Sequence, residues 1–417
     1  MNELGAAIKK LRKEKKMTLA QLAGDRLTKG MLSLIENGKA QPSMESLRYI
    51  ADRLEVDVTA LLHNQSLAQR RTLLLQAEEM MKNATDVFRN KTQEEILEEM
   101  LLLLTPVIDK IQGAYFEDVR LMDLWMRASR QLKKGFDLQE YKKVLEKYEE
   151  LHAFTYVIKG YSFLCWNAYE ERDYKTVLEF LLQGEQVLNN HEYMVDDLVK
   201  LDLYYNLALA YGALNDYKQM EVYMDKAMDL SKRNRIYYRL EDFYRLMFSR
   251  AVELEDRGKS EKYLIKLRLL DELAQDFQMH TFFVYANAHY ANFIEKDFRK
   301  AIRLLKDFLP VLEEKRGKGS LVSPLFQVEQ AYAHFQLGEA EHVIEVLAAL
   351  YMPEFQQHPF DLIYLYFGFA IRAAAYNALG NHEKAKRDIL YAHNGSLTLA
   401  DSKYKMFIIE KYEIIMK

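Results

Sequence analysis

Apolar residues recur every three or four positions through residues 1–65, a spacing that predicts short amphipathic helices. Thr18 followed by Gln21 fits a capping box, and Asn37-Gly38 is a helix C-terminal signal. We therefore expect five helices in a compact bundle, named the head below. The expected N-caps are Thr18, Thr28, Ser43 and Asp57. The positions expected to face its core are Leu4, Ile8, Leu11, Leu32, Ile35, Leu47, Ile50, Leu54, Leu61 and Leu62.

The rest of the chain also follows a helical pattern. No proline stands between Pro106 and Pro310, a stretch of 203 residues. Helix formers fill this stretch, with apolar residues three and four positions apart and no hairpin signal between alternating runs. Residues 66–115 are charged, and we expect a helical connector there with a break at Pro106. The whole chain is predicted to be all-α.

A two-helix pattern repeats along residues 116–417. Its clearest copy runs from Tyr204, with a tight turn at Asn215-Asp216 and a second helix packed back on the first. The residues aligned with the turn aromatic stand at 174, 217, 260, 298, 340 and 382, at spacings of 43, 43, 38, 42 and 42. Such a period predicts stacked helical hairpins in a solenoid, with an irregular helical bundle as the alternative.

Charge is distributed unevenly along the chain. Residues 1–48 carry ten Lys and Arg against five Asp and Glu, so this segment is +5 and the rest is −9 of the net −4. A basic head on an acidic body favours nucleic-acid binding by the head alone, and chance clustering is the alternative.

The cysteine count and the apolar runs indicate the compartment. The single cysteine, Cys165, excludes a disulfide framework and a cysteine-ligated zinc site, and it fits a reducing environment. No apolar segment follows the basic N-terminus, and no run approaches the ~20 residues that span a bilayer. We expect a cytoplasmic protein without a membrane partner.

The head resembles the lambda-repressor-like helix-turn-helix domains of the Xre type. The resemblance rests on Ile8-Lys-Lys-Leu-Arg12, Met17-Thr18, Gln21-Leu-Ala23, Leu32-Ser-Leu-Ile-Glu-Asn-Gly-Lys39 and Gln41-Pro-Ser43. The last two blocks are the most specific, because they join a recognition helix, its glycine stop and the cap of the next helix. This resemblance implies a third helix that enters the DNA major groove.

The resemblance also assigns roles to residues of the head. It implies a structural ion pair between Arg12 and Glu36, which ties the first helix to the third. Leu19 departs from the family, which usually has glutamine at the start of the second helix. The candidate DNA contacts are Thr28, Lys29, Gly30, Ser33, Leu34, Asn37 and Lys39. Thr28, Lys29 and Lys39 suit phosphates, whereas Ser33, Leu34 and Asn37 suit base edges; a solvated surface is the alternative.

The repeats resemble tetratricopeptide repeats, best between Tyr204 and Leu230. Met220 departs from the alanine usual in that family, and the spacings are longer than its usual repeat. The expected architecture is a right-handed α-solenoid after the head. Together the two parts resemble the peptide-responsive quorum-sensing regulators of the Rgg, Rap, NprR, PlcR and PrgX group, with an NprR-like layout. The resemblance implies a short signalling peptide, a double-stranded DNA operator and a homodimer or higher homo-oligomer as partners.

Four polar residues are candidates for peptide binding in the groove of the repeats. Asn206 and Asn287 stand ten residues before the turn aspartates, where an amide can clamp a peptide backbone. Lys159 precedes Asp173 by the same number of residues as Arg245 precedes Lys259, so the two share a second position in the repeat if Lys259 is aligned with the turn. Either side chain could hold a peptide carboxylate. Ordinary polarity of a solvated groove is the alternative for all four.

The sequence contains none of the common catalytic motifs. It has no zinc-protease, nucleophile-elbow, phosphate-loop or dinucleotide-binding pattern. The scattered histidines, including His280 and His289, are interpreted as structural, and no cofactor, metal site or enzymatic activity is expected. The leading hypothesis is a peptide-regulated transcription regulator. The alternative is a Rap-like adaptor that binds a response regulator and modulates its phosphorylation.

Overall fold

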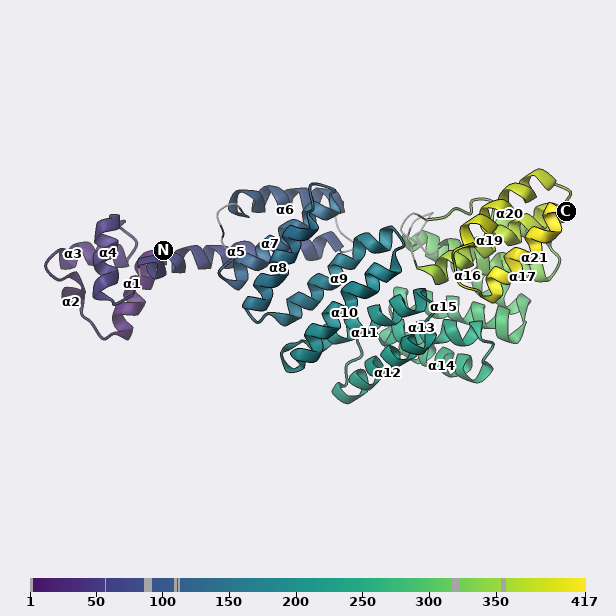
Figure 1. Cartoon of the computed structure of the whole chain (residues 1–417), viewed down its shortest axis with the longest axis horizontal. Coiled ribbons are helices and arrows are strands. Elements are labelled where there is room, and N and C mark those ends of the chain that lie inside the picture. Colours follow the sequence, from purple (N-terminus) through teal and green to yellow (C-terminus); the bar gives the residue numbers. More distant parts are fainter. Residues whose placement is uncertain are drawn as a thin grey trace. The chain divides into compact units, whose positions relative to one another are not determined.

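The computed structural model describes residues 3–56, 58–85, 92–108, 111, 113–316, 323–353 and 358–417. Their regular structure is helical, and no strand occurs among them (Figure 1). The chain divides into two compact units, Met1–Ala153 and Phe154–Lys417. None of the helices in these ranges combines the length and the apolar character needed to cross a bilayer. The all-α prediction is confirmed for the described part of the chain.

The head opens the first unit as a bundle around a closed apolar core. Its helices are α1 (Glu3–Glu14), α2 (Leu19–Ala23), α3 (Lys29–Glu36), α4 (Met44–Arg53) and the first turns of α5 (Val58–Thr85). The capping predictions at Thr18, Thr28 and Ser43 are confirmed, since each hydroxyl accepts a hydrogen bond from the backbone N–H three residues later. Asp57, the expected cap of the fifth helix, lies outside the described residues.

The fifth helix is longer than expected from the sequence. α5 continues for 28 residues, because no glycine or proline between Val58 and Thr85 ends it. Residue 65, the expected end of the head, therefore lies inside a continuous helix. The division into 1–65, 66–115 and 116–417 stays a prediction.

Three further helices complete the first unit. They are α6 (Gln93–Ile108), α7 (Phe116–Gln131) and α8 (Leu138–Glu150). Pro106 does not break α6 where the sequence suggests, but stands inside its last turn. A proline leaves the carbonyl four residues earlier without its helical donor. Here that carbonyl belongs to Leu102, which is 77% exposed, so water can replace the donor.

The second unit is a stack of helical hairpins. Each helix packs against the next in chain order, and several first helices also pack on the first helix of the following hairpin. The hairpins are α9 (Phe154–Glu170) with α10 (Tyr174–Asn190), α11 (Asp197–Ala213) with α12 (Tyr217–Asn234), α13 (Leu240–Glu253) with α14 (Arg257–Ala274), α15 (Phe277–Tyr290) with α16 (Phe298–Arg316), α17 (Ser323–Gln336) with α18 (Ala340–Val346) and α19 (Pro359–Ala378) with α20 (His382–Ser396). α21 (Lys403–Met416) packs on the last pair, and η1 (Glu192–Met194) follows α10. This order is that of the predicted α-solenoid.

The six turns inside these hairpins share one construction. A residue in the left-handed region comes first, and the N-cap of the second helix follows it. In the clearest copy Asn215 has φ 65°, and the Asp216 carboxylate then accepts a hydrogen bond from the N–H of Gln219. The left-handed residues are Arg172, Asn215, Glu255, Lys296, Gly338 and Gly380.

One turn differs from its predicted position. The third hairpin turns at Glu255-Asp256 and its second helix begins at Arg257, so the position aligned with the turn aromatic is 257 rather than 260. The second helices then begin at 174, 217, 257, 298, 340 and 382, at the more regular spacings of 43, 40, 41, 42 and 42. The weak Arg257-Gly258-Lys259 signal misled the alignment, because it lies in the first turn of α14.

A π-helical turn ends the first helix of the fourth hairpin. This segment, η2 (Ala291–Glu295), follows α15 without a break. A π-turn inserts one extra residue into a helix and so shifts every earlier side chain by one position relative to the turn. Asp297 is the turn aspartate of this hairpin. A residue that precedes Asp297 therefore stands one position farther from it than the equivalent residue stands from Asp216 or Asp256.

Candidate nucleic-acid interface and ligand cavity

The third helix of the head presents a short exposed face. Leu32 and Ile35 are buried, whereas Lys29 is exposed and Leu34 is 45% exposed. The backbone at Gly30 also lies open, because a Cβ there would meet only the Thr28 hydroxyl at 3.9 Å. This face can approach a nucleic acid closely.

Two of the candidate DNA-binding residues are hydrogen-bonded to each other. Asn37 is the C-cap of α3, and its Nδ2 donates to the Ser33 carbonyl oxygen at 2.8 Å. Lys9 Nζ donates to Asn37 Oδ1 at 3.4 Å. The Asn37 amide is therefore engaged within the head, while Ser33 is half-buried at the edge of the exposed face. Lys39, just past the helix end, is exposed.

Met31 is a feature of this face that the sequence analysis missed. It is 47% exposed on α3, next to Leu34, so two large apolar side chains meet solvent on the recognition helix. Apolar side chains there can contact thymine methyl groups. The signal was present in the sequence, because Met31 lies three residues before Leu34 on the same helix.

The first and third helices are joined by an ion pair. Arg12 Nε and Nη2 donate to the two carboxylate oxygens of Glu36 at 2.6 and 2.8 Å. Arg12 Nη1 also donates to the Met17 carbonyl at 2.8 Å. The hydrogen bond to Glu36 raises the pKa of the Arg12 guanidinium further above its ordinary value. Both side chains are nearly buried, so the pair positions α3 and does not contact DNA itself.

The helix before the recognition helix begins with an apolar residue. Leu19, which replaces the glutamine usual in the resembled family, packs partly buried against the core of the head. A cationic cluster lies near the other end of α2, where the guanidinium carbons of Arg26 and Arg53 stand 5.5 and 5.7 Å from the centroid of the Tyr49 ring. Tyr49 Oη also donates to Asp25 at 2.8 Å.

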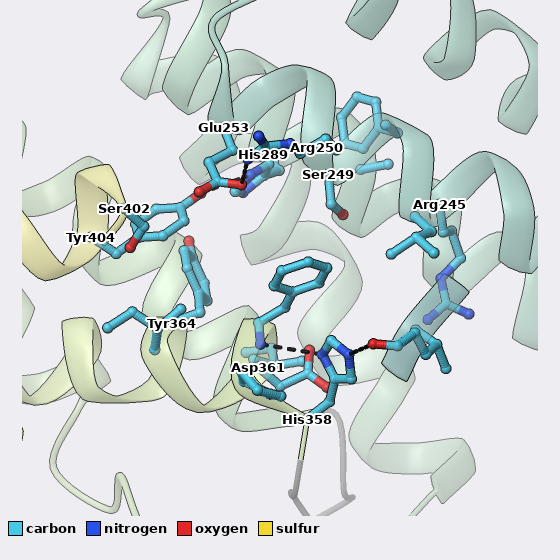
Figure 2. A pocket seen from close by; sticks show the side chains of 18 of the residues that line it. Arg245, Ser249, Arg250, Glu253, His289, His358, Asp361, Tyr364, Ser402 and Tyr404 are labelled. Atoms are coloured by element: carbon cyan, nitrogen blue, oxygen red, sulfur yellow. Dashed lines mark hydrogen bonds and ion pairs between the residues drawn. The ribbon is translucent and has the colours of Figure 1, made fainter. Parts of the chain in front are cut away.

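The second unit contains a cavity of about 440 Å³ (Figure 2). Most of its lining comes from α11, α13, α15, α17 and α19, which are the first helices of five successive hairpins. Nine tyrosine and phenylalanine rings contribute to the wall, and Figure 2 shows labelled polar side chains around the same space. Its aromatic members are Tyr205, Tyr217, Phe248, Phe282, Tyr285, Phe326, Phe360, Tyr364 and Tyr404.

Equivalent positions of three hairpins line this cavity. Tyr205 precedes Asp216 by the same number of positions as Arg245 precedes Asp256. Tyr285 stands one position farther from Asp297, and the additional position is the residue that the π-turn inserts. The residues one helical turn later, Leu209, Ser249 and His289, also line the cavity and follow the same rule.

The cationic side chains of the cavity already have partners. Arg245 Nη1 lies 3.3 Å from Asp242 Oδ1, and its guanidinium carbon lies 3.7 Å from the centroid of the Phe282 ring. Arg250 donates to Glu253 at 2.8 Å. The wall therefore carries paired charges rather than a free positive patch, which favours an occupant that is mainly apolar.

A buried polar network forms one end of the cavity. Glu329 is fully buried, and Tyr364 Oη donates to its Oε1 at 2.5 Å while His289 Nδ1 contacts the same oxygen. Asn292 Nδ2 donates to Oε2 at 2.8 Å. Burial raises the pKa of the Tyr364 and Tyr404 hydroxyls well above the ordinary value, so both face the site as neutral groups.

His358 closes another side of the cavity and caps α19. Its Nδ1 accepts a hydrogen bond from the N–H of Phe360 at 3.2 Å, and its Nε2 donates to the Leu209 carbonyl at 3.2 Å. Burial lowers the pKa of His358, with Asp361 acting in the opposite direction. The lowered pKa favours the neutral ring, and Figure 2 shows the two hydrogen bonds that hold it. The sequence signal that could have revealed this cap is Pro359, since proline favours the first helical position.

The four candidate peptide-binding residues lie at different kinds of position. Arg245 lines the cavity. Asn206 on α11 and Asn287 on α15 are half-buried and do not line it, although each follows a lining residue in the chain, and Lys159 is exposed on α9. Neither asparagine side chain has a hydrogen-bond partner among the described residues. The Lys159 ammonium lies 5.3 Å from the centroid of the Tyr156 ring.

The shared offsets assumed for these residues were wrong. Because of the π-turn, Ala286 rather than Asn287 is equivalent to Asn206. Because the third turn lies at Asp256, Arg245 is nearer to its turn aspartate than Lys159 is to Asp173. A role for each residue in peptide binding stays a prediction, without the support of a common position.

A comparison with protein-family models agrees with the helix-turn-helix interpretation of the head. Residues 8–61 match the HTH_3 family model, described as helix-turn-helix. A search of curated proteins returned no match.

Several solved structures are similar to this chain. One is PlcR from Bacillus thuringiensis in complex with the peptide PapR7 and DNA, at 20% identity and a TM-score of 0.37, covering 68% of this chain and 98% of that one. Another is the apo form of the competence regulator ComR from Streptococcus vestibularis, at 16% identity and a TM-score of 0.33, covering 70% and 98%. A third is a tetratricopeptide repeat protein from Parabacteroides merdae, at 12% identity and a TM-score of 0.38, covering 82% and 99%.

The family match and the structure coincide on the same segment. The matched residues begin within α1 and end in the first turns of α5, so they contain α2, α3 and α4 completely. The N-caps and the buried core of that segment account for its fold. The match to the helix-turn-helix family model therefore covers residues 8–61 of the head.

Proposed function

We propose that this protein is a cytoplasmic transcription regulator, not an enzyme, that binds a DNA operator and responds to a short peptide. One observation carries the proposal: the chain joins a helix-turn-helix domain to a stack of hairpins that encloses a cavity. Neither part alone would suggest regulation, because a head can bind DNA without a sensor and a cavity can serve many ligands.

The DNA-binding half of the proposal rests on the exposed face of α3. In the proposal the exposed Lys29 and Lys39 contact phosphates, and Ser33 and Leu34 contact base edges. Asn37 is also assigned to the interface, where it would exchange its bond to Ser33 for a base. Gly30 and Thr28 allow the start of α3 to approach the DNA backbone closely. One head makes few contacts, so we propose that two copies bind two half-sites as a homodimer.

The peptide-binding half rests on the shape and chemistry of the cavity. Its volume and its aromatic wall suit one or two large apolar side chains of a peptide. Asn206 and Asn287 each follow a cavity-lining residue in the chain, and their amides have no partner among the described residues, so we assign them to the peptide backbone. Arg245 contributes a stacked guanidinium whose carboxylate partner a ligand can replace. Lys159, farther along the stack, would meet the peptide only if the peptide extends beyond the cavity.

Coupling between the two activities follows from the architecture of stacked hairpins. The geometry of a solenoid is the sum of small rotations between neighbours, so a ligand held by several hairpins can change it. In the proposal this change alters the placement of two heads on their half-sites. A ligand shifts such an equilibrium only by its differential affinity, and the coupling is reciprocal.

Reciprocity provides the test. A peptide is selected from a random-sequence library on the full-length chain and labelled, and its affinity is measured with and without an operator selected from random DNA. The operator is expected to change peptide affinity by the same factor as the peptide changes operator affinity. If the operator leaves peptide affinity unchanged, gating fails and the adaptor that binds a response regulator becomes the better account.

Variants connect the test to the cavity. Asn206→Ala with Asn287→Ala is expected to abolish the peptide response and to leave basal DNA binding intact. Ser249→Phe, which fills the cavity from α13, is expected to weaken peptide binding as well. Asn189→Ala with Asn190→Ala on the exposed surface of α10 is the matched control and should change neither activity.

A further inference from the structure

Three potential metal ligands meet at the turn of the fifth hairpin. His334 lies near the end of α17, Glu339 precedes α18, and His342 lies in its first turn. Each offers one ligand atom, and these atoms lie within 4.8 Å of one another. Among the described residues this is the one group of three or more histidine, cysteine or carboxylate side chains so arranged.

The local structure holds the three side chains near one another. Gly338, with φ 77°, reverses the chain between the helices. His334 Nδ1 lies 2.6 Å from Glu339 Oε2, and the imidazoles of His334 and His342 stack with an interplanar angle of 9°. Glu339 makes no capping hydrogen bond to α18, so its carboxylate is not committed to the helix.

The burial of the three residues provides both rigidity and access. The His334 side chain is 10% exposed and fixed, whereas Glu339 is 34% exposed and His342 is exposed. Rotation of the two more accessible side chains can bring their ligand atoms to the ~2 Å distances of metal bonds. Solvent can then supply the remaining ligand.

We propose that His334, Glu339 and His342 form a binding site for a divalent transition-metal ion, with zinc as the best-suited metal. Two imidazole nitrogens and one carboxylate oxygen are a donor set that zinc accepts, with a fourth position left for water. Calcium and magnesium prefer a shell of oxygens, so they are expected not to bind. None of the three residues lines the cavity, and the site does not depend on the proposed regulatory function.

One nearby charge opposes the ion. Arg299 is close enough to act on the Glu339 carboxylate electrostatically. A bound cation competes with this guanidinium, which predicts that Arg299→Gln strengthens zinc binding. Zinc bound by histidines elsewhere on the surface would not respond in this way.

The direct test is a zinc titration of the untagged full-length protein. A chromophoric chelator reports affinity and stoichiometry, and cobalt absorption reports the ligand field. One zinc ion per chain is expected, with a rise in the melting temperature. Loss of a side chain that only supports a metal ligand usually lowers metal affinity about 10–100-fold. Loss of a ligand itself, in His342→Ala or Glu339→Gln, should lower zinc affinity by at least as much. Both residues are accessible to solvent, so the chain should still fold.

A histidine–carboxylate pair elsewhere in the chain serves as the control for nonspecific zinc binding at the surface. His280 lies 3.0 Å from Asp271 and is half exposed, but no third ligand joins them among the described residues. His280→Ala should leave zinc binding unchanged. The proposal is overturned if zinc binds with no defined stoichiometry, or if His342→Ala and Glu339→Gln bind zinc as the parent does.

Discussion

Arg12 and Glu36 are far apart in the chain, yet their side chains form two parallel hydrogen bonds of 2.6 and 2.8 Å between α1 and α3. The side chains are 11% and 3% exposed. A third hydrogen bond, to the Met17 carbonyl, fixes the guanidinium. The orientation of the recognition helix therefore depends on a nearly buried charge pair.

Removal of one partner should destabilise the head. Glu36→Ala leaves the Arg12 guanidinium poorly solvated, and breaking such a pair costs about 3–5 kcal/mol. Thermal unfolding of unit 1 in the full chain should show a lower melting temperature. Glu55→Ala removes the carboxylate of an exposed pair with Lys15 and serves as the control, with no measurable change expected. An unchanged melting temperature for Glu36→Ala would exclude a stabilising role for the pair.

A glycine of the head should tolerate no side chain. A Cβ at Gly5 would stand 2.0 Å from the Ile35 carbonyl oxygen, so α1 and α3 would have to separate. Overpacking of this kind costs about 1–3 kcal/mol, and α3 would also lose its position for DNA. Gly5→Ala should therefore reduce both the melting temperature and DNA affinity, whereas Gly30→Ala, which meets open space, should spare the fold. Equal melting temperatures for the parent and Gly5→Ala would contradict the close contact.

Two residues of α3 should differ in their effect on DNA binding. Lys29→Ala should weaken binding to all sequences and reduce the dependence of affinity on salt, because one phosphate contact is lost. Ser33→Ala should mainly reduce the preference for the operator. Anisotropy titrations on the operator and on random DNA at several salt concentrations distinguish the two effects. Equal losses on both DNAs for Ser33→Ala would exclude base reading by Ser33.

His358 should make the stability of the second unit depend on pH. Burial lowers its pKa from the ordinary 6.5, so the unfolded chain takes up a proton more readily than the folded one. The free energy of unfolding should thus fall as pH drops through and below about 6.5. Protonation also removes the Nδ1 acceptor that caps α19. His358→Asn keeps a capping oxygen without titrating, so its stability should vary less over this range; identical pH profiles would refute the assignment.

Much of the fold could be predicted from local chemistry. Thr18, Thr28 and Ser43 have short hydroxyl side chains that cap helices through neighbours only three residues away, which a linear sequence reveals. The turn at Asn215-Asp216 is predictable for the same reason. The exposed face of α3 followed from the burial of Leu32 and Ile35.

Features that depend on long-range contacts were not predictable. The π-turn at Ala291–Glu295 has no local signature, and it displaced Asn287 from the position expected for it. Met220 replaces a small residue because Gly212 faces it, with only 3.1 Å from a Cβ at Gly212 to the Met220 sulfur. The buried network around Glu329 joins several helices, so no spacing in the sequence could reveal it.

The most direct test of the central claim is selection of duplexes from random DNA by the full-length chain, followed by affinity measurements on the selected and a shuffled duplex at one salt concentration. The account predicts a selected sequence with two related half-sites about one DNA turn apart. It also predicts a preference of at least about 10³-fold over the shuffled duplex, which Ser33→Ala reduces. Equal affinity for both duplexes, or a preference that Ser33→Ala leaves unchanged, would contradict sequence-specific binding through α3.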